Sequence, residues 1–428
     1  MTSAEIQLYG TTVGAVSWDA ARRLAYFEYD PGFLSSGIEI SPLNLPLRPG
    51  VFSFPDLKRS TFQGLPGLLS DALPGLPENL LIEQWLSPAD RPATLFNPVE
   101  RLLSLGARAM GALEFYPSRS PRHPAQRLEL ATLVPWAQES VSSHNSRENG
   151  SAPPSQAVAT ALRASTAAGA VRAEALISWH PESGEIWSPG INPPAGGEPW
   201  LLKFDGGDGH RNPASSDPAA SGRLELAYHL MARAAGIQVG AGRLLGGRGR
   251  AHFMTRRFDR LPNGGKVHVQ SLSALAHVDF HDPGSCSYEH AFQVARQLRL
   301  PHPDMTELFR RSVFNLVARN QDDPPKNIAF LMDRHGMWRL APAFNLTYVH
   351  NLWTNRHQMS LAGKRDGFTP ADLHTGGLAA SLKPRQIRAV LDQVKQAVSA
   401  WPDSAGTAGV PAPIIQALRS GLRLHLIP

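Results

Sequence analysis

Apolar and polar positions alternate over the first part of the chain. Ile6 and Leu8 are separated by polar residues, and similar short runs follow before the turn at Asp30. A period of two places alternate side chains on one face, as a half-buried strand requires. The pattern therefore predicts three strands, over residues 5–10, 13–18 and 24–29.

The pattern changes further along the chain. Residues 62–115 have a largely helical pattern, broken at 73–75, whereas residues 137–160 are rich in Ser, Asn, Ala and Pro and predict a linker. An amphipathic helix is expected over 224–235 and should end at Gly236. Further strands are expected over 175–179, 199–204, 251–258, 328–332 and 338–340. Much of the remaining C-terminal part should be helical, which gives an α+β fold with a β-rich N-terminal segment, a β-rich lobe and an α-rich lobe.

Composition limits the class of protein. The chain has 428 residues, of which 42% are hydrophobic, so it can bury a sizeable core in two or three domains. Its single cysteine, Cys286, excludes a disulfide framework within the chain and a multi-cysteine zinc site, and it suits a reducing compartment. The sequence has neither an apolar stretch that could span a bilayer nor a secretory-signal pattern at its N-terminus. We therefore expect a cytoplasmic protein with no membrane partner.

Charge adds little to this picture. The chain carries 42 Lys and Arg against 36 Asp and Glu, a formal net charge of +6 with histidine neutral. Spread over so long a chain, this excess permits an anionic partner such as nucleic acid or an acidic protein, but does not indicate one.

The most informative stretch is 319–327, between an apolar helical run and the predicted strand 328–332. In it, Asp322 precedes Asn327 by five residues, which is the spacing of a kinase catalytic loop. In such a loop the Asp accepts the proton of the attacking hydroxyl, and the Asn carbonyl holds a magnesium ion against the phosphates. On spacing alone, a polar turn is the favoured interpretation, because Asp and Asn are common in turns.

A second candidate is Lys203, which stands in the otherwise apolar strand 199–204. A buried lysine needs an anionic partner, and a nucleotide phosphate is a natural one. The alternatives are an edge-strand lysine that reaches solvent and a structural ion pair.

Taken together, these and other short stretches resemble the HipA family, the serine/threonine kinase toxins of bacterial toxin–antitoxin modules. The stretches occur in the family's order, so their combination is specific where each one alone is not. In the N-terminal part the resemblance rests on residues 62–66, 69–74 and 110–115. In the core it rests on residues 200–205, 222–225, 257–260, 287–289 and 320–327.

The resemblance implies a two-lobed, protein-kinase-like core with ATP and Mg²⁺ as cofactors. It implies an N-terminal β-rich domain over 1–120, a linker over 121–160, a nucleotide-binding β-rich lobe over 161–265 and an α-rich catalytic lobe over 266–428. Position by position, Asp322 matches the catalytic base, Asn327 a metal ligand and Lys203 the lysine that meets the nucleotide phosphates.

The resemblance also assigns residues around the nucleotide. Arg256 and Phe258 match the hinge whose backbone faces adenine, and Gln270 matches a residue of the nucleotide pocket. Gly169 and Ala170 belong to a stretch that matches the small-residue loop over the phosphates. In the family that loop can carry an autophosphorylated serine. Ala167 stands at that position here, so the nearest candidate hydroxyls are those of Ser165 and Thr166, with a solvated hydroxyl of no regulatory role as the alternative.

Three further departures concern the phosphates. The family has an aspartate that holds magnesium where this chain has Asn345, commonly a histidine where it has Pro324, and a lysine where it has Glu174. An asparagine carbonyl lacks the net charge of a carboxylate, the usual protein ligand of magnesium. We expect these departures to weaken metal-bridged handling of the triphosphate, about tenfold in rate for each 1.4 kcal/mol lost.

Three hypotheses follow. Asp322 and Asn327 favour an ATP-dependent serine/threonine kinase toxin, slow or with altered metal use. Asn345, Pro324 and Glu174 favour a pseudokinase that binds nucleotide without phosphoryl transfer. The third hypothesis is a binding module that joins a DNA complex through a separate helix-turn-helix antitoxin. The resemblance implies that antitoxin as a partner, DNA only indirectly, and a protein substrate that is typically a component of translation.

Overall fold

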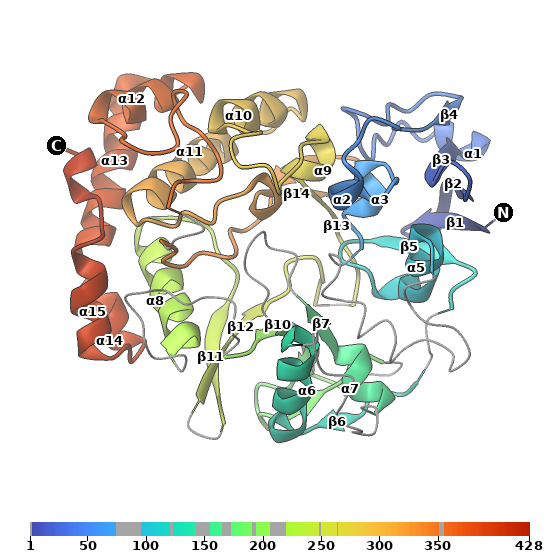
Figure 1. The fold of residues 1–428 in the computed structure, drawn as a ribbon, viewed down its shortest axis with the longest axis horizontal. Coiled ribbons are helices and arrows are strands. Elements are labelled where there is room, and N and C mark those ends of the chain that lie inside the picture. Colours follow the sequence, from blue (N-terminus) through green and yellow to red (C-terminus); the bar gives the residue numbers. More distant parts are fainter. Residues whose placement is uncertain are drawn as a thin grey trace.

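The structure is a computed structural model of the whole chain. It describes residues 2–73, 96–119, 123–142, 155–164, 173–190, 194–205, 220–247, 250–262, 264–350 and 355–428. Figure 1 shows a β-rich N-terminal domain, a second lobe built on a sheet, and a helical lobe that contains the C-terminus. Within these residues, no helix is both long and apolar enough to cross a membrane.

The N-terminal domain is built on a five-stranded antiparallel sheet among the described residues, in the order β4-β3-β2-β1-β5. Its strands are β1 (Thr2–Leu8), β2 (Thr11–Asp19), β3 (Leu24–Tyr29), β4 (Val51–Phe52) and β5 (Leu113–Tyr116). The domain also contains the short helices α1 (Pro31–Leu34), α2 (Arg59–Phe62), α3 (Gly67–Ser70) and α5 (Pro98–Leu105), of which α1 and α5 pack against its strands. The three strands expected at the start of the chain are confirmed.

The largely helical pattern expected over 62–115 is wrong at its C-terminal end. Leu113 and Phe115 are buried, and the more exposed Glu114 separates them. They belong to β5, which pairs antiparallel with β1 in a register that joins Ile6 to Phe115. The free edge of β1 therefore decides the conformation here, because a strand that pairs there satisfies the backbone groups that β1 would otherwise expose.

The second lobe contains a seven-stranded sheet, counted over the described residues. Its main path runs β11 (Gly242–Gly247), β12 (Arg250–Arg256), β10 (Glu198–Lys203), β8 (Ala173–Trp179), β9 (Ile186–Trp187) and β6 (Arg127–Leu128), with β7 (Leu162–Ala164) also on β8. The strands expected over 175–179, 199–204 and 251–258 are confirmed.

Part of the predicted linker is helical. Helices α6 (Leu130–Ser142) and α7 (Gln156–Ala161) occupy much of its described part. Leu133, Ala137 and Val158 are buried in the same hydrophobic core as the seven-stranded sheet. These small and medium apolar residues are buried because they pack against the sheet. The local composition does not show that contact, and so it predicted a linker.

Most of the helical lobe follows β12. Its helices are α8 (Ser221–Ala234), α9 (Leu272–Ala276), α10 (Tyr288–Gln297), α11 (His302–Val317), α12 (Pro370–Ala379), α13 (Pro384–Ser399), α14 (Trp401–Thr407) and α15 (Ala412–Arg419). A small sheet joins them, with β13 (His268–Ser271), β14 (Ala329–Met332) and β15 (Trp338–Leu340) in that order. Helix α8 ends before Gly236, whose φ of +77° suits glycine, as expected. It begins earlier in the chain than the rest of the lobe and packs between β12 and α14.

The N-terminal domain shares its core with the helical lobe. One hydrophobic cluster contains buried residues of both, whereas the seven-stranded sheet has a separate cluster. Polar contacts reinforce the shared boundary: the Tyr9 hydroxyl donates to the Met332 carbonyl at 2.8 Å and accepts from the His268 amide at 3.0 Å. The N-terminal domain is therefore attached firmly to the side of the molecule that carries residues 319–327.

Candidate active site

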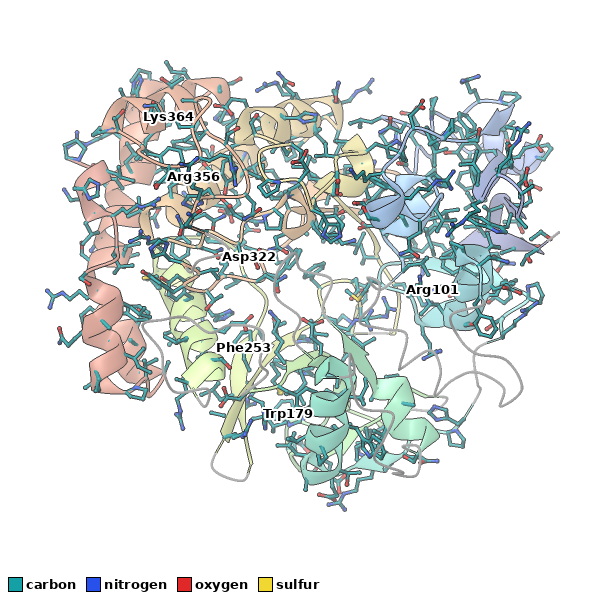
Figure 2. All side chains as sticks on the ribbon, in the orientation of Figure 1. Arg101, Trp179, Phe253, Asp322, Arg356 and Lys364 are labelled. Atoms are coloured by element: carbon teal, nitrogen blue, oxygen red, sulfur yellow. The ribbon has the colours of Figure 1, made fainter. Side chains whose placement is uncertain are left out.

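A cavity of about 160 Å³ lies between the seven-stranded sheet and the helical lobe. The sheet side is lined by Leu201, Lys203, Phe253 and Thr255, and the opposite side by Asn327, Ala329, Ala343, Asn345 and Leu346. Arg256 and Phe258, the residues predicted to form a hinge, also line it. Figure 2 shows Phe253 among the strands, and Asp322 at the edge of the helical lobe that borders those strands. The cavity is mostly apolar with polar groups gathered in one part, which is typical of a small-molecule site.

Lys203 anchors the polar part of the cavity. It lies on β10, between β8 and β12, so it is not an edge-strand lysine. Its Nζ donates to the carboxylate of Glu225 on α8 and to Oδ1 of Asn345 at 2.6 Å. The Lys203 and Glu225 side chains are only 8% and 4% exposed. The buried lysine thus has an anionic partner from the protein itself, and the pair lies in the cavity wall.

Asn345 connects Lys203 to the loop that follows α11. Its Nδ2 donates to Oδ1 of Asn327 at 3.0 Å, and Nδ2 of Asn327 donates to the Asp322 carbonyl at 3.1 Å. Asn345 has a φ of +54°, a left-handed conformation that asparagine and aspartate tolerate better than most residues. A continuous hydrogen-bonded path therefore runs from Glu225 on α8, through Lys203 on the sheet and Asn345, to residues 322–327.

The adjacent carboxylates of Asp322 and Asp323 have different surroundings. Asp322 lines a smaller cavity together with Pro324, Asn327 and Asn345. Asp323 is buried in a polar network: it accepts from the Tyr288 hydroxyl at 2.7 Å and the Gln358 amide at 2.7 Å, and lies 2.9 Å from Nδ1 of His357. Asp322 thus faces a cavity, while Asp323 holds the loop in place.

The variant Asp323→Ala should lower the free energy of unfolding by about 3 kcal/mol or more. It leaves the buried Tyr288 hydroxyl and the Gln358 amide without their acceptor, and each such loss costs about 1–3 kcal/mol. Urea denaturation measures the change. As a control, Asp392→Ala removes a 54% exposed carboxylate paired with Arg388, and should change the unfolding free energy by less than about 0.5 kcal/mol. Equal effects of the two variants would contradict an anchoring role for Asp323.

Other ionisable groups shape the electrostatics of the cavity. Burial lowers the pKa of His229 to about 4, so its ring is neutral at pH 7 and adds no positive charge. Glu174 is buried on β8, directly opposite Lys203 in the strand register. The acidic departure therefore does lie in the cavity wall, next to the lysine. At the hinge, burial alone would raise the pKa of Asp259, but Arg257 and Arg260 outweigh it and hold that pKa well below its usual range.

The structure does not support one predicted site residue. Gln270 is fully buried, and its Nε2 donates to the Ser41 hydroxyl of the N-terminal domain at 3.0 Å. Its neighbours on β13, Val269 and Ser271, line the cavity instead. The prediction for Gln270 is therefore corrected: side chains alternate along a strand, so Gln270 points away from the cavity that Val269 and Ser271 line. Gly169, Ala170, Ser165, Thr166 and Ala167 lie outside the described residues.

Three residues of the cavity wall were not identified from the sequence. Glu225 had one available indication, an acidic residue among buried positions of α8. Lys326 lies inside the loop that the sequence singled out, next to Asn327, and Asp71 comes from the N-terminal domain. Nothing in the sequence pattern indicates that Asp71, 255 positions from Lys326, meets it.

The residues around Asp322 suit a hard cation. They offer one carboxylate, from Asp322, and the amide oxygens of Asn327 and Asn345. An amide oxygen has two lone pairs, so Oδ1 of Asn345 can accept from Lys203 and still face a cation. Magnesium is often held by one or two carboxylates together with substrate phosphates. With a single carboxylate, these residues fit Mg²⁺ with the smallest negative charge that such sites have. Within the described part of the chain, no group of three or more His, Cys, Asp or Glu residues could hold a metal ion.

Comparison with known proteins identifies both parts of the chain. Residues 4–116 match the HipA N-terminal domain, and residues 166–401 match the HipA-like C-terminal domain. No curated protein matches the chain by sequence.

Solved structures that match this chain include a toxin–antitoxin complex and a kinase. One is the toxin–antitoxin complex of HipA, HipB and operator DNA from Shewanella oneidensis MR-1, with a TM-score of 0.67 and 16% identity over 99% of this chain and 96% of that one. The other is the proinflammatory kinase CtkA of Helicobacter pylori, with a TM-score of 0.33 and 11% identity over 59% of this chain and 92% of that one. The first likeness shows a shared fold along nearly the whole chain and agrees with the expected two-lobed α+β architecture.

Proposed function

The chain belongs to the HipA family, and from this premise we propose that it is the toxin of a toxin–antitoxin module and acts as an ATP-dependent serine/threonine protein kinase. One observation carries the kinase proposal. The Lys203–Glu225 pair on one side of the cavity is joined through Asn345 to the loop that holds Asp322 and Asn327 on the other. These residue types, in this arrangement, are those that position and transfer a phosphoryl group.

The nucleotide would bind with its base against the hinge and its phosphates toward Lys203. Arg256 and Phe258 line the hinge side, and apolar residues such as Leu201 and Ala329 would enclose the base. Gly169 and Ala170 would cover the phosphates, as the family resemblance implies. If the family's autophosphorylation occurs here, Ser165 and Thr166 are the candidate hydroxyls.

In the proposed reaction, the hydroxyl oxygen of a substrate serine or threonine bonds to the γ-phosphorus, the bond to the β-phosphate oxygen breaks, and ADP leaves. Asp322 accepts the hydroxyl proton as general base. Asn327 and Asn345 would hold Mg²⁺, which when bound would neutralise charge on the phosphates. Lys203, held by Glu225, orients the nucleotide.

The proposed partners follow from the family. The Shewanella structure contains HipA together with HipB and operator DNA. We propose that this chain likewise binds a helix-turn-helix antitoxin and meets DNA only through it, in the cytoplasm. The protein substrate would be a component of translation. Co-purification with the product of the neighbouring gene tests the antitoxin, and absence of a complex at micromolar concentrations would count against it.

A second candidate function is a pseudokinase, and one observation favours it. An amide stands at position 345, in contact with both Lys203 and Asn327, where the family carries a carboxylate. Transfer of radiolabelled phosphate and nucleotide affinity, each with Mg²⁺ and with Mn²⁺, distinguish the candidates. Binding with transfer supports the kinase, binding without transfer supports the pseudokinase, and no nucleotide binding would reject both.

The variant Glu225→Gln should weaken ATP binding about tenfold, equivalent to about 1.4 kcal/mol. Glutamine keeps the size of the side chain but removes the charge that holds Lys203, so the lysine loses its fixed orientation toward the phosphates. Isothermal titration measures the affinity. The control Glu185→Gln removes an ion pair of the lobe that carries Lys203. Glu185 pairs with Arg127 at 3.1 Å, and neither residue lines the cavity. The ATP affinity of this variant should equal that of the unmodified protein.

A further inference from the structure

We propose that Asp71 of the N-terminal domain is a positioning residue for phosphoryl transfer, because it fixes Lys326 so that the lysine ammonium faces the γ-phosphate. This inference rests on the function proposed above. It assigns the N-terminal domain a part in the active site, beyond that of a neighbouring domain.

The contact between the two residues is direct and largely shielded from water. Lys326 Nζ forms an ion pair with Oδ1 of Asp71, and the side chains are 16% and 11% exposed. The Lys326 ammonium also lies 5.6 Å from the centre of the Phe280 ring. A lysine held by a carboxylate and an aromatic face has few alternative rotamers, so its position is defined. Both Asp71 and Lys326 line the same cavity as Lys203 and Asn327.

Asp71 is itself held in place by the helical lobe. Its Oδ2 accepts from the Ser271 amide at 2.7 Å, and its Oδ1 accepts from the Ser271 hydroxyl at 2.9 Å. Ser271 caps the N-terminus of α9, so the carboxylate is tied to the start of that helix. Asp71 therefore accepts hydrogen bonds from Ser271 as well as from Lys326. The bonds from Ser271 fix the position of the carboxylate that binds Lys326.

Helix α3, which precedes Asp71, packs against α9. In Figure 1 both lie where the N-terminal domain meets the helical lobe. The Gly67 amide donates to Nε2 of His277 at 3.0 Å. A Cβ atom at Gly67 would lie only 2.1 Å from the Ala274 carbonyl oxygen, so this approach requires glycine. The close fit places Asp71 with little freedom relative to the loop that carries Lys326.

The position of Lys326 suits the transferred phosphate. It immediately precedes Asn327, whose amide is joined to Asn345 and, through it, to Lys203. A lysine ammonium has three N–H donors. Lys203 uses two of them, for Glu225 and Asn345, whereas Lys326 uses one for Asp71. Lys326 can therefore donate to a phosphate oxygen without leaving Asp71. A cation at this place would recognise ATP more than ADP, because only ATP carries the γ-phosphate.

The test compares four proteins: the unmodified chain, Asp71→Asn, Lys326→Met and the double variant. The affinities for ATP and for ADP are measured by isothermal titration, and phosphate transfer by radiolabel. We expect the unmodified chain to prefer ATP. Each single variant should lower that preference and the transfer rate about tenfold, and the double variant should lose no more than either single one, since the two residues act as a unit.

The matched control is Glu114→Gln. Glu114 pairs with Lys266 at 2.6 Å, in another ion pair between the N-terminal domain and the core, and neither residue lines the cavity. This variant should keep both the ATP preference and the rate. The inference is overturned if Asp71→Asn keeps them too, or if Glu114→Gln loses them equally. Absence of nucleotide binding by the unmodified chain would instead reject the proposed function, and the inference with it.

Discussion

Replacement of Asp322 by asparagine is expected to slow phosphoryl transfer about a thousandfold while ATP affinity changes little. General-base catalysis contributes roughly 10²–10⁴ in rate, and an amide cannot accept the hydroxyl proton. The substitution is nearly isosteric, and the Asp322 carbonyl that accepts from Asn327 is part of the backbone, so the loop should keep its form. Initial rates of radiolabelled transfer give the loss, and titration with ATP gives the affinity.

The control for this prediction is Asp392→Asn, on the exposed face of α13. It removes a carboxylate that lines neither cavity and should leave both quantities unchanged. If Asp322→Asn transfers phosphate within tenfold of the unmodified rate, the base is another group and the assignment of Asp322 is wrong. If only ATP affinity falls, Asp322 contributes to binding and has no role as a base.

The variant Asn345→Asp is expected to raise the transfer rate tenfold or more and to lower the Mg²⁺ concentration needed for half-maximal activity. In the present structure Nδ2 of Asn345 donates to Oδ1 of Asn327 at 3.0 Å. A carboxylate there would place two acceptor oxygens opposite each other, an arrangement that a cation between them stabilises. Aspartate also tolerates the left-handed backbone at this position, so the change should not strain the loop.

Magnesium titrations of activity and of thermal stability measure this effect. Asn345→Gly is the matched control: it suits the positive φ and removes the amide without adding charge, so it should show no stronger response to Mg²⁺ than the unmodified chain. A chain that binds ATP without transfer, but gains transfer in Asn345→Asp, would establish the pseudokinase. An unchanged magnesium requirement in Asn345→Asp would show that position 345 does not face the metal.

Local pattern predicted the elements that depend on their own residues. Strands β2 and β3 follow from alternation, and the end of α8 follows from Gly236. The errors fall where a distant partner decides the structure. β5 is a strand because β1 offers an open edge, and part of the predicted linker is helical because the seven-stranded sheet buries its apolar residues. Secondary structure in such places depends on tertiary contacts, which a local pattern does not contain.

The sequence by itself determined the candidate chemistry. The spacing of Asp322 and Asn327, a lysine in an apolar strand, and the ordered resemblance to one family were sufficient to propose a phosphoryl-transfer site. All three of these indications lie within short segments of the chain. Within a short segment, the local backbone conformation fixes how far apart neighbouring residues lie. The same reasoning located the missing carboxylate at Asn345.

Only the tertiary structure decided which groups meet. It paired Lys203 with Glu225, turned Gln270 toward the N-terminal domain, and brought Asp71 to Lys326. These contacts join residues on different elements, and hydrophobic burial and close packing select them across the whole core. A buried charge then needs its partner within hydrogen-bonding distance. For that reason the sequence can supply the charged residues of this site, while the fold alone determines how they are paired.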